Sequence, residues 1–146
     1  MSADLVAFLR ARLDEDEAVA RAATRGPWTW KEYRGDLPYL TGRGGAPGGY
    51  EYETEVVEAE HFGECGCRSA CHLELKVSER DRAHIARHDP ARVLRQVEAG
   101  RQIIAEAAYY LDTCGDEDVQ VHATHTLESL AAIYRDHEDY REEWAL

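Results

Sequence analysis

The spacing of apolar residues changes along this chain from a helical period to a strand period and back, and this change constrains the fold most. Leucine recurs at helical spacing from Leu5 to Leu13, and residues 91–134 carry further apolar stripes of the same period. In residues 50–60 and 72–77, apolar side chains alternate with charged ones, as in half-buried antiparallel strands. The pattern predicts an α+β fold in which three or four helices pack on a small antiparallel sheet.

Capping and breaking residues mark the expected ends of the helices. A Gly-Pro pair follows the first helix, and Ser78 with Asp81 resembles a capping box at the start of the second. Asp89 is a suitable N-cap for the third helix, because Pro90 fits the first helical position. The helices are therefore expected at residues 4–24, 78–88, 91–111 and 117–134, and the last one can continue beyond residue 134.

Glycine and proline organise the segment between the first helix and the alternating strands. Residues 28–33 are a candidate strand, whereas residues 35–49 hold six glycines and two prolines and are expected to form a loop. The glycine-rich part near residues 42–49 lacks the Gly-Lys-Ser/Thr ending of a phosphate-binding loop, so we interpret it as a flexible connector. At 146 residues, the chain is expected to form a single domain, residues 1–146.

Metal-ligating side chains are concentrated at the tip of the expected hairpin of residues 50–60 and 72–77. This tip, residues 61–72 (HFGECGCRSACH), holds three of the four cysteines and two of the seven histidines. Zinc takes four ligands in structural sites, usually cysteine thiolates and histidine nitrogens. The sequence therefore predicts a structural zinc site whose ligands are drawn from Cys65, Cys67, Cys71 and either His61 or His72.

The spacing of these cysteines leaves other interpretations open. It is C-x-C-x3-C, not the paired C-x2-C of zinc ribbons and fingers, so a disulfide or redox pair and free surface thiols remain alternatives. Cys114 is a rival fourth ligand, and together with His122 and His125 it forms a second, weaker constellation. A catalytic pair of Cys71 and His72 is disfavoured, since neighbours on a strand point to opposite faces.

Each long helix places one polar residue on its apolar stripe. Helical spacing puts Asp16 beside Leu13, Arg101 near Val97, and His137 beyond Leu130 if the last helix continues. A buried charge needs a partner, so an internal salt bridge of Asp16 with Arg101 is expected, with His137 bonded to one of them or to the backbone. Alternatively, Asp16, Arg101 and His137, with His88, line an anion or substrate pocket, or they are simply exposed.

Composition limits the partners of the protein. The formal net charge is −12, with 29 acidic and 17 basic side chains, which argues against direct binding to nucleic-acid phosphates and favours a basic protein partner. No run of about 18 apolar residues is present, and the N-terminal segment lacks the features of a signal peptide. We therefore expect a cytoplasmic protein that does not span a membrane.

Three segments carry a resemblance to a known family: LVAFLRARLDEDEAVA (residues 5–20), HIARHDPARVLRQVEAGR (residues 84–101) and YRDHEDYREEW (residues 134–144). They resemble a domain-of-unknown-function family of small, acidic, uncharacterised actinobacterial and actinophage proteins. The resemblance covers both ends and the centre and is weakest across residues 28–76. Glu138 departs from the family's DHPDY pattern. The resemblance implies an origin and a fold context but no activity.

Three functions of different classes are compatible with these features. The leading hypothesis is a non-enzymatic cytoplasmic accessory protein that binds a basic macromolecule and carries a zinc-stabilised hairpin loop. The second is an enzyme of unassigned class that uses an interhelical pocket around Asp16, Arg101 and His137. The third is an acidic nucleic-acid mimic that inhibits a basic partner, which requires regularly spaced acidic rows on one face.

Overall fold

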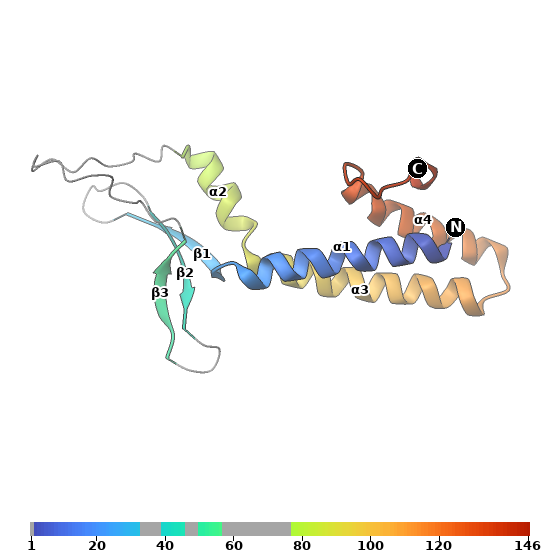
Figure 1. Ribbon diagram of the computed structural model, residues 1–146, viewed down its shortest axis with the longest axis horizontal. Helices are drawn as coiled ribbons and strands as arrows, with labels where there is room; N and C mark the ends of the chain where they lie inside the picture. Colours follow the sequence, from blue (N-terminus) through green and yellow to red (C-terminus); the bar gives the residue numbers. More distant parts are fainter. Residues whose placement is uncertain (1, 33–38, 46–49, 57–76) are drawn as a thin grey trace, which may run out of the picture. The chain divides into compact units, whose positions relative to one another are not determined.

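The computed structural model describes residues 2–32, 39–45, 50–56 and 77–146, and these form helices and a three-stranded antiparallel sheet (Figure 1). The α+β prediction is therefore confirmed. The chain divides into two compact units, one of Met1–Ala20 with Val93–Leu146 and one of Arg21–Arg92. The elements in chain order are α1 (Ser2–Ala22), β1 (Arg25–Lys31), β2 (Tyr39–Gly44), β3 (Tyr52–Glu55), α2 (Glu79–Arg87), α3 (Pro90–Thr113), α4 (Glu117–Ala131), and the 3-10 helices η1 (Ala132–Tyr134) and η2 (Glu142–Trp144).

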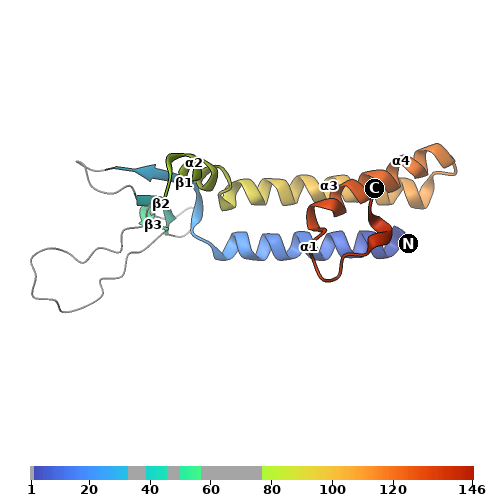
Figure 2. The ribbon, with the colours of Figure 1, turned by 90° about the horizontal axis from the view of Figure 1, so that it is seen from above.

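The helical unit is built from α1, α3 and α4, and α1 lies alongside α3 in both views (Figures 1 and 2). Their apolar stripes form one core, as the sequence predicted. Gly100 on α3 allows the close approach, because a Cβ at this position would lie 3.1 Å from Leu13 on α1. The buried core comprises Leu5, Phe8, Leu9, Leu13, Val97, Ile104, Ala107, Ala123, Leu127, Ala131 and Trp144.

The C-terminal tail does not continue α4 as a straight helix. After Ala131 the chain tightens into η1, and the backbone N–H of His137 donates to the carbonyl oxygen of Tyr134 at 2.9 Å. The expectation that His137 lies on an extension of the last helix was therefore wrong. The turns bring Trp144 back onto Phe8 of α1, with ring centroids 4.8 Å apart, and this aromatic burial favours the turns over further helix.

The second unit contains the sheet, with strand order β1-β2-β3. Strand β2 lies inside residues 35–49, which the sequence analysis assigned to a loop. Its first residues are strand formers and Leu40 is buried, which outweighs the glycines that follow. Gly42 and Gly44 occupy positions where a Cβ would lie 2.7 Å from the Arg25 carbonyl oxygen and 2.5 Å from the Tyr52 ring, respectively.

Strand β3 pairs with β2, in the register Gly42 opposite Thr54. It covers four of the residues expected to form the strand at 50–60. The expected partner strand at residues 72–77 lies almost wholly outside the described residues, as does the cysteine- and histidine-rich tip at residues 61–72.

Two helix caps hold the same unit together, as predicted. Ser78 Oγ accepts the backbone N–H of Asp81 at 3.2 Å, which caps α2. Asp89 Oδ1 accepts the backbone N–H of Arg92 at 2.7 Å at the start of α3, and its Oδ2 accepts the backbone N–H of Trp28 on β1 at 3.1 Å. The buried carboxylate of Asp89 therefore joins the start of α3 to the sheet. Among the described residues, no helix combines the length and apolarity needed to cross a membrane.

Candidate functional site

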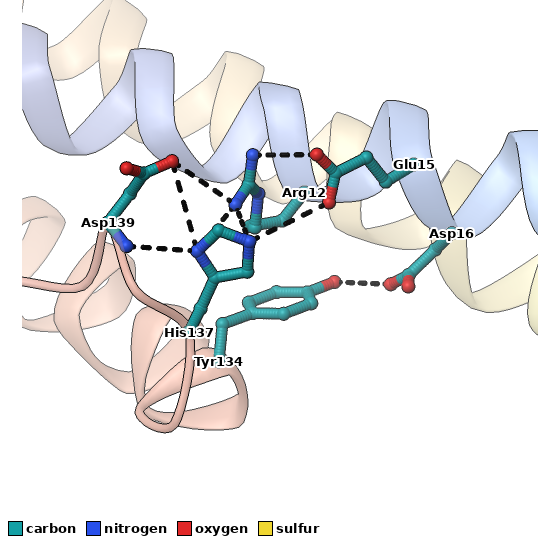
Figure 3. Close-up of polar contacts among 6 residues, drawn as sticks. All are labelled: Arg12, Glu15, Asp16, Tyr134, His137 and Asp139. Carbon is teal, nitrogen blue, oxygen red and sulfur yellow. Dashed lines mark hydrogen bonds and ion pairs between the residues drawn. The ribbon is translucent and has the colours of Figure 1, made fainter.

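Arg12 is the centre of a polar cluster between α1 and the turn that follows η1 (Figure 3). Its side chain is buried although it is charged. Arg12 Nη2 donates to Glu15 Oε1 at 2.8 Å, and Nη1 lies 3.5 Å from Asp139 Oδ2. Nη1 also contacts the ring nitrogens of His137. The two carboxylates compensate the buried charge of Arg12.

His137 is thus positioned by a turn and not by a helix. Its Nδ1 accepts the backbone N–H of Asp139 at 3.1 Å, and its Nε2 lies 3.9 Å from Glu15 Oε2. The ring is partly exposed and packs edge-on against Phe8, with centroids 6.0 Å apart. The cluster therefore links α1 to the tail through charge and aromatic contact together.

Asp16 and Arg101 have partners other than each other, so the predicted salt bridge between them was wrong. Asp16 Oδ2 accepts the hydroxyl of Tyr134 at 2.6 Å. Arg101 Nη2 donates to Asp14 Oδ1 at 2.6 Å and to Glu17 Oε2 at 2.5 Å. Asp14 and Glu17, which lie one turn of α1 apart, therefore form ion pairs with Arg101 of α3, whereas Asp16 faces η1.

The hydrogen-bond partners of Tyr134 and Arg101 shift the pKa of each side chain. Burial, and then the hydrogen bond to Asp16, raises the pKa of Tyr134 above its ordinary value, so the phenol stays protonated and remains a donor. Hydrogen bonds to Glu17 and Asp14 raise the pKa of Arg101, whose side chain is partly exposed. Arg101 is therefore a surface ion-pair residue that joins α1 to α3.

Within the helical unit, the structure does not bring Asp16, Arg101 and His137 into one pocket. A pocket of about 160 Å³ in the helical unit is lined by Asp16, but neither Arg101 nor His137 lines it. His88 belongs to Arg21–Arg92, is exposed, and stacks near His84 with ring centroids 4.4 Å apart. Desolvation, and then the charges of His84 and neighbouring arginines, lowers the pKa of His88.

The predicted metal ligands Cys65, Cys67, Cys71, His61 and His72 all lie outside the described residues. Cys114 is a half-buried free thiol at the end of α3, and His122 and His125 are exposed on α4. Within residues 2–32, 39–45, 50–56 and 77–146, no group of three or more His, Cys, Asp or Glu side chains is arranged to hold a metal ion.

The sequence analysis missed Arg12, although a signal was available. Arg12 follows Phe8 by four residues and Leu9 by three, so helical spacing places it on the buried stripe of α1. A search for every polar residue on that stripe would have found both Arg12 and Asp16. Tyr134 was considered only as the end of the apolar stripe in residues 117–134, and its hydroxyl was not considered as the partner of Asp16.

A groove lies beside the Arg12 cluster, between the first turns of α1 and the tail. Its volume is about 480 Å³, and we refer to it as the α1–tail groove. Carboxylates of Asp4, Glu138 and Asp139 border it, and Trp144 forms part of its wall. The lining residues are Asp4, Ala7, Phe8, Ala11, Arg12, Glu138, Asp139, Tyr140, Arg141 and Trp144.

Both arginines of the α1–tail groove are already engaged by carboxylates. Arg141 Nη1 lies 3.0 Å from Asp4 Oδ2 and 3.6 Å from Glu143 Oε1, while Arg12 is bound to Glu15 and lies near Asp139. Their positive charge is therefore largely compensated, and Glu138 adds a further exposed carboxylate. The same pairs compensate Asp4 and Asp139, so the lining carries a net charge of −1, and Glu138 is its carboxylate without an ion pair among the described residues. The buried rings of Phe8 and Trp144 form its aromatic part.

The acidic charge of the chain is concentrated in the unit that carries this groove. Met1–Ala20 and Val93–Leu146 hold 17 acidic and 6 basic side chains, a net charge of −11. Arg21–Arg92 holds 12 acidic and 11 basic side chains, a net charge of −1. The helical unit therefore carries −11 of the net charge of −12.

The fold and these sites define a small α+β protein with an acidic helical unit. The chain belongs to the family of unknown function DUF6221, whose model matches residues 2–146. This confirms the resemblance to an uncharacterised family that the sequence motifs indicated. No curated protein and no solved structure matches the chain.

Proposed function

We propose that this protein is a cytoplasmic, non-enzymatic accessory protein whose helical unit binds a basic segment of a protein partner in the α1–tail groove. The observation that carries the proposal is the groove itself, which has carboxylates of Asp4, Glu138 and Asp139 at its border and aromatic side chains inside. Lysine and arginine side chains would pair with Glu138 and compete with Arg141 and Arg12 for Asp4 and Asp139, and their methylene groups would cover the aromatic rings.

A second observation supports a peptide as the ligand. The Nε1 of Trp144 is buried and has no hydrogen-bond partner among the described residues. A buried donor without an acceptor is unfavourable by about 1–3 kcal/mol, and a peptide carbonyl oxygen is a suitable acceptor after a small shift of the tail. A basic peptide offers that oxygen and the positive side chains together.

The charge of the unit adds a kinetic advantage. A net charge of −11 on one unit attracts a basic partner over a distance comparable to the Debye length, about 8–10 Å at physiological ionic strength. Such steering raises the association rate more than the final affinity. Binding should therefore be fast and strongly dependent on salt.

Fluorescence anisotropy with a labelled peptide of alternating lysine and glycine tests the proposal, with a glutamate–glycine peptide as the control ligand. The protein is compared with the variant Asp4→Asn/Glu138→Gln and with the matched variant Glu98→Gln/Glu128→Gln, which removes two charges from the same unit away from the groove. We expect the groove variant to weaken binding several-fold and the matched variant to change it little.

Three results would overturn this proposal. The first is the absence of binding to the lysine peptide even at about 0.05 M salt, where screening is weak. The second is equal weakening in both variants, because this would show that overall charge, and not the groove, determines binding. The third is equal binding of the glutamate peptide.

We also propose that Cys65, Cys67 and Cys71, with His61 or His72, bind a structural zinc ion. The support is the density of thiolates and imidazoles within residues 61–72, which matches the ligand preference of zinc. A bound metal would stabilise a loop that has few apolar side chains of its own.

A further inference from the structure

The pocket beside Asp16 is separate from the α1–tail groove and has a different lining. It is formed by α1, α3 and the end of α4 with η1, within the helical unit. Its floor consists of aliphatic side chains that are at least nine-tenths buried: Leu9, Leu13, Val97 and Ile104. Ile133, which is 71% exposed, also lines it, so the pocket opens to solvent on that side.

Gly100 contributes to the shape of this pocket. It lines the pocket on α3, and Leu13 is the nearest neighbour of the position that its Cβ would occupy, at 3.1 Å. The pocket has a volume of about 160 Å³. An apolar cavity of comparable size, about 150 Å³, is known to admit a molecule as large as benzene. The space therefore suits a compact hydrocarbon body.

Asp16 is the charged residue of the pocket lining. Its Oδ2 accepts the hydroxyl of Tyr134, which also lines the pocket, and this bond fixes the carboxylate at the wall. The other oxygen, Oδ1, accepts no hydrogen bond from the described part of the chain, so a ligand can bind there without displacing Tyr134. The remaining polar lining side chain apart from Tyr134 is the neutral amide of Gln96.

The surroundings of Asp16 favour a cation. Asp14, Glu15 and Glu17 lie on the same two turns of α1, and the arginines that pair with them, Arg12 and Arg101, are not part of the pocket lining. Together with Asp16, these carboxylates outnumber the two arginines by four to two, so the net charge around the pocket is negative and repels an anionic ligand. Charge complementarity and the apolar floor together select an organic cation with an apolar body.

We propose that this pocket binds a small primary amine with a compact hydrocarbon body of about six carbons. The ammonium group donates to Asp16 Oδ1 near the mouth, and the hydrocarbon contacts the aliphatic floor between α1 and α3. Tyr134 is a positioning residue that holds the carboxylate. This site does not depend on the basic partner proposed for the α1–tail groove.

Isothermal titration calorimetry with cyclohexylamine tests this site, with cyclohexanol and cyclohexanecarboxylate as ligands of the same shape and different charge. A charge-assisted hydrogen bond is about twice as strong as a neutral one, so we expect the amine to bind about tenfold more tightly than the alcohol. The carboxylate should not bind measurably. Chemical shifts of the Val97 and Ile104 methyl groups should respond to the amine.

Three variants locate the site. Asp16→Asn should remove the preference for the amine over the alcohol, while Glu106→Gln, which removes a charge outside this pocket, should leave it unchanged. Val97→Ile adds a methyl group to the floor and should weaken amine and alcohol alike. Circular dichroism of each variant verifies that the helices are intact.

Several outcomes would overturn the proposal. Equal affinity of the amine and the alcohol for the unaltered protein would show that Asp16 does not select charge. Full amine binding by folded Asp16→Asn would place the cation elsewhere, and amine binding unaffected by Val97→Ile would place the hydrocarbon elsewhere. Absence of binding by every probe would show that the pocket takes no such ligand. None of these results bears on peptide binding in the α1–tail groove.

Discussion

Trp144 anchors the C-terminal tail on α1, and the substitution Trp144→Ala is expected to lower the free energy of unfolding of the helical unit by about 3 kcal/mol. The side chain is 2% exposed, so it removes about 200 Å² of apolar surface from water. At about 25 cal/mol per Å² this burial contributes about 5 kcal/mol, or about 3–4 kcal/mol for a compact unfolded chain. Contact with Phe8 adds about 1 kcal/mol, and the unpartnered Nε1 subtracts about 1–3 kcal/mol.

Urea unfolding followed by circular dichroism at the helical wavelength measures this change. The matched variant Trp144→Phe keeps an aromatic ring and removes the unpartnered donor, so its loss should be no more than about 1 kcal/mol. Trypsin under native conditions provides a second measurement, since Arg135 and Arg141 are exposed already but lie in a backbone held by turn hydrogen bonds, which Trp144→Ala should release for cleavage. A loss below about 1 kcal/mol for Trp144→Ala, with the tail still protected, would refute the reasoning that tail docking depends on this ring.

Three further predictions follow from the caps, the buried phenol and the cysteine-rich loop. Asp89→Ala should lower the free energy of unfolding of Arg21–Arg92 by about 2 kcal/mol and lower its melting temperature, because one carboxylate accepts from two backbone N–H groups. Asp89→Asn should cause a smaller loss, and equal losses in the two variants would contradict the role of charge. Because the pKa of Tyr134 is raised on folding, its contribution to stability is complete below the ordinary tyrosine pKa of about 10 and is lost at higher pH. Ultraviolet titration should show one tyrosine that ionises at higher pH than the others, and Asp16→Asn should lower the pH at which it ionises. Elemental analysis of protein purified without a histidine tag should find about one zinc ion per chain, with thiols released only after chelation, and metal-free protein with four titratable thiols would refute the zinc site.

The helices could be predicted from the sequence because their signals are local. The apolar stripe of α1 and the caps at Ser78 and Asp89 each lie within a few residues of the boundary that they set. Strand β2 was missed for the opposite reason. Its glycines are a loop signal in isolation, and they suit a strand only because Arg25 and Tyr52 approach them from β1 and β3.

For the polar residues as well, nearby sequence predicted the helix face on which a side chain lies, whereas its partner depended on residues far away in the sequence. Helical spacing correctly placed Asp16 toward other elements, but it could not determine whether Arg101 or Tyr134 would be the partner. The choice depends on where η1 ends and how the tail turns, which in turn depends on Trp144 reaching Phe8. Contacts across more than a hundred residues of sequence therefore decide the chemistry of α1.

The division of the helical unit into two distant stretches of sequence also has a consequence for how the chain folds. Met1–Ala20 is synthesised early, but the residues that bury its apolar stripe begin at Val93. Until those residues leave the ribosome, the leucine stripe and Phe8 of α1 have no native partner and must remain exposed or be shielded by a chaperone. Closing contacts across so long an intervening segment is also entropically slow. We therefore expect the helical unit to form only once the C-terminal tail is available.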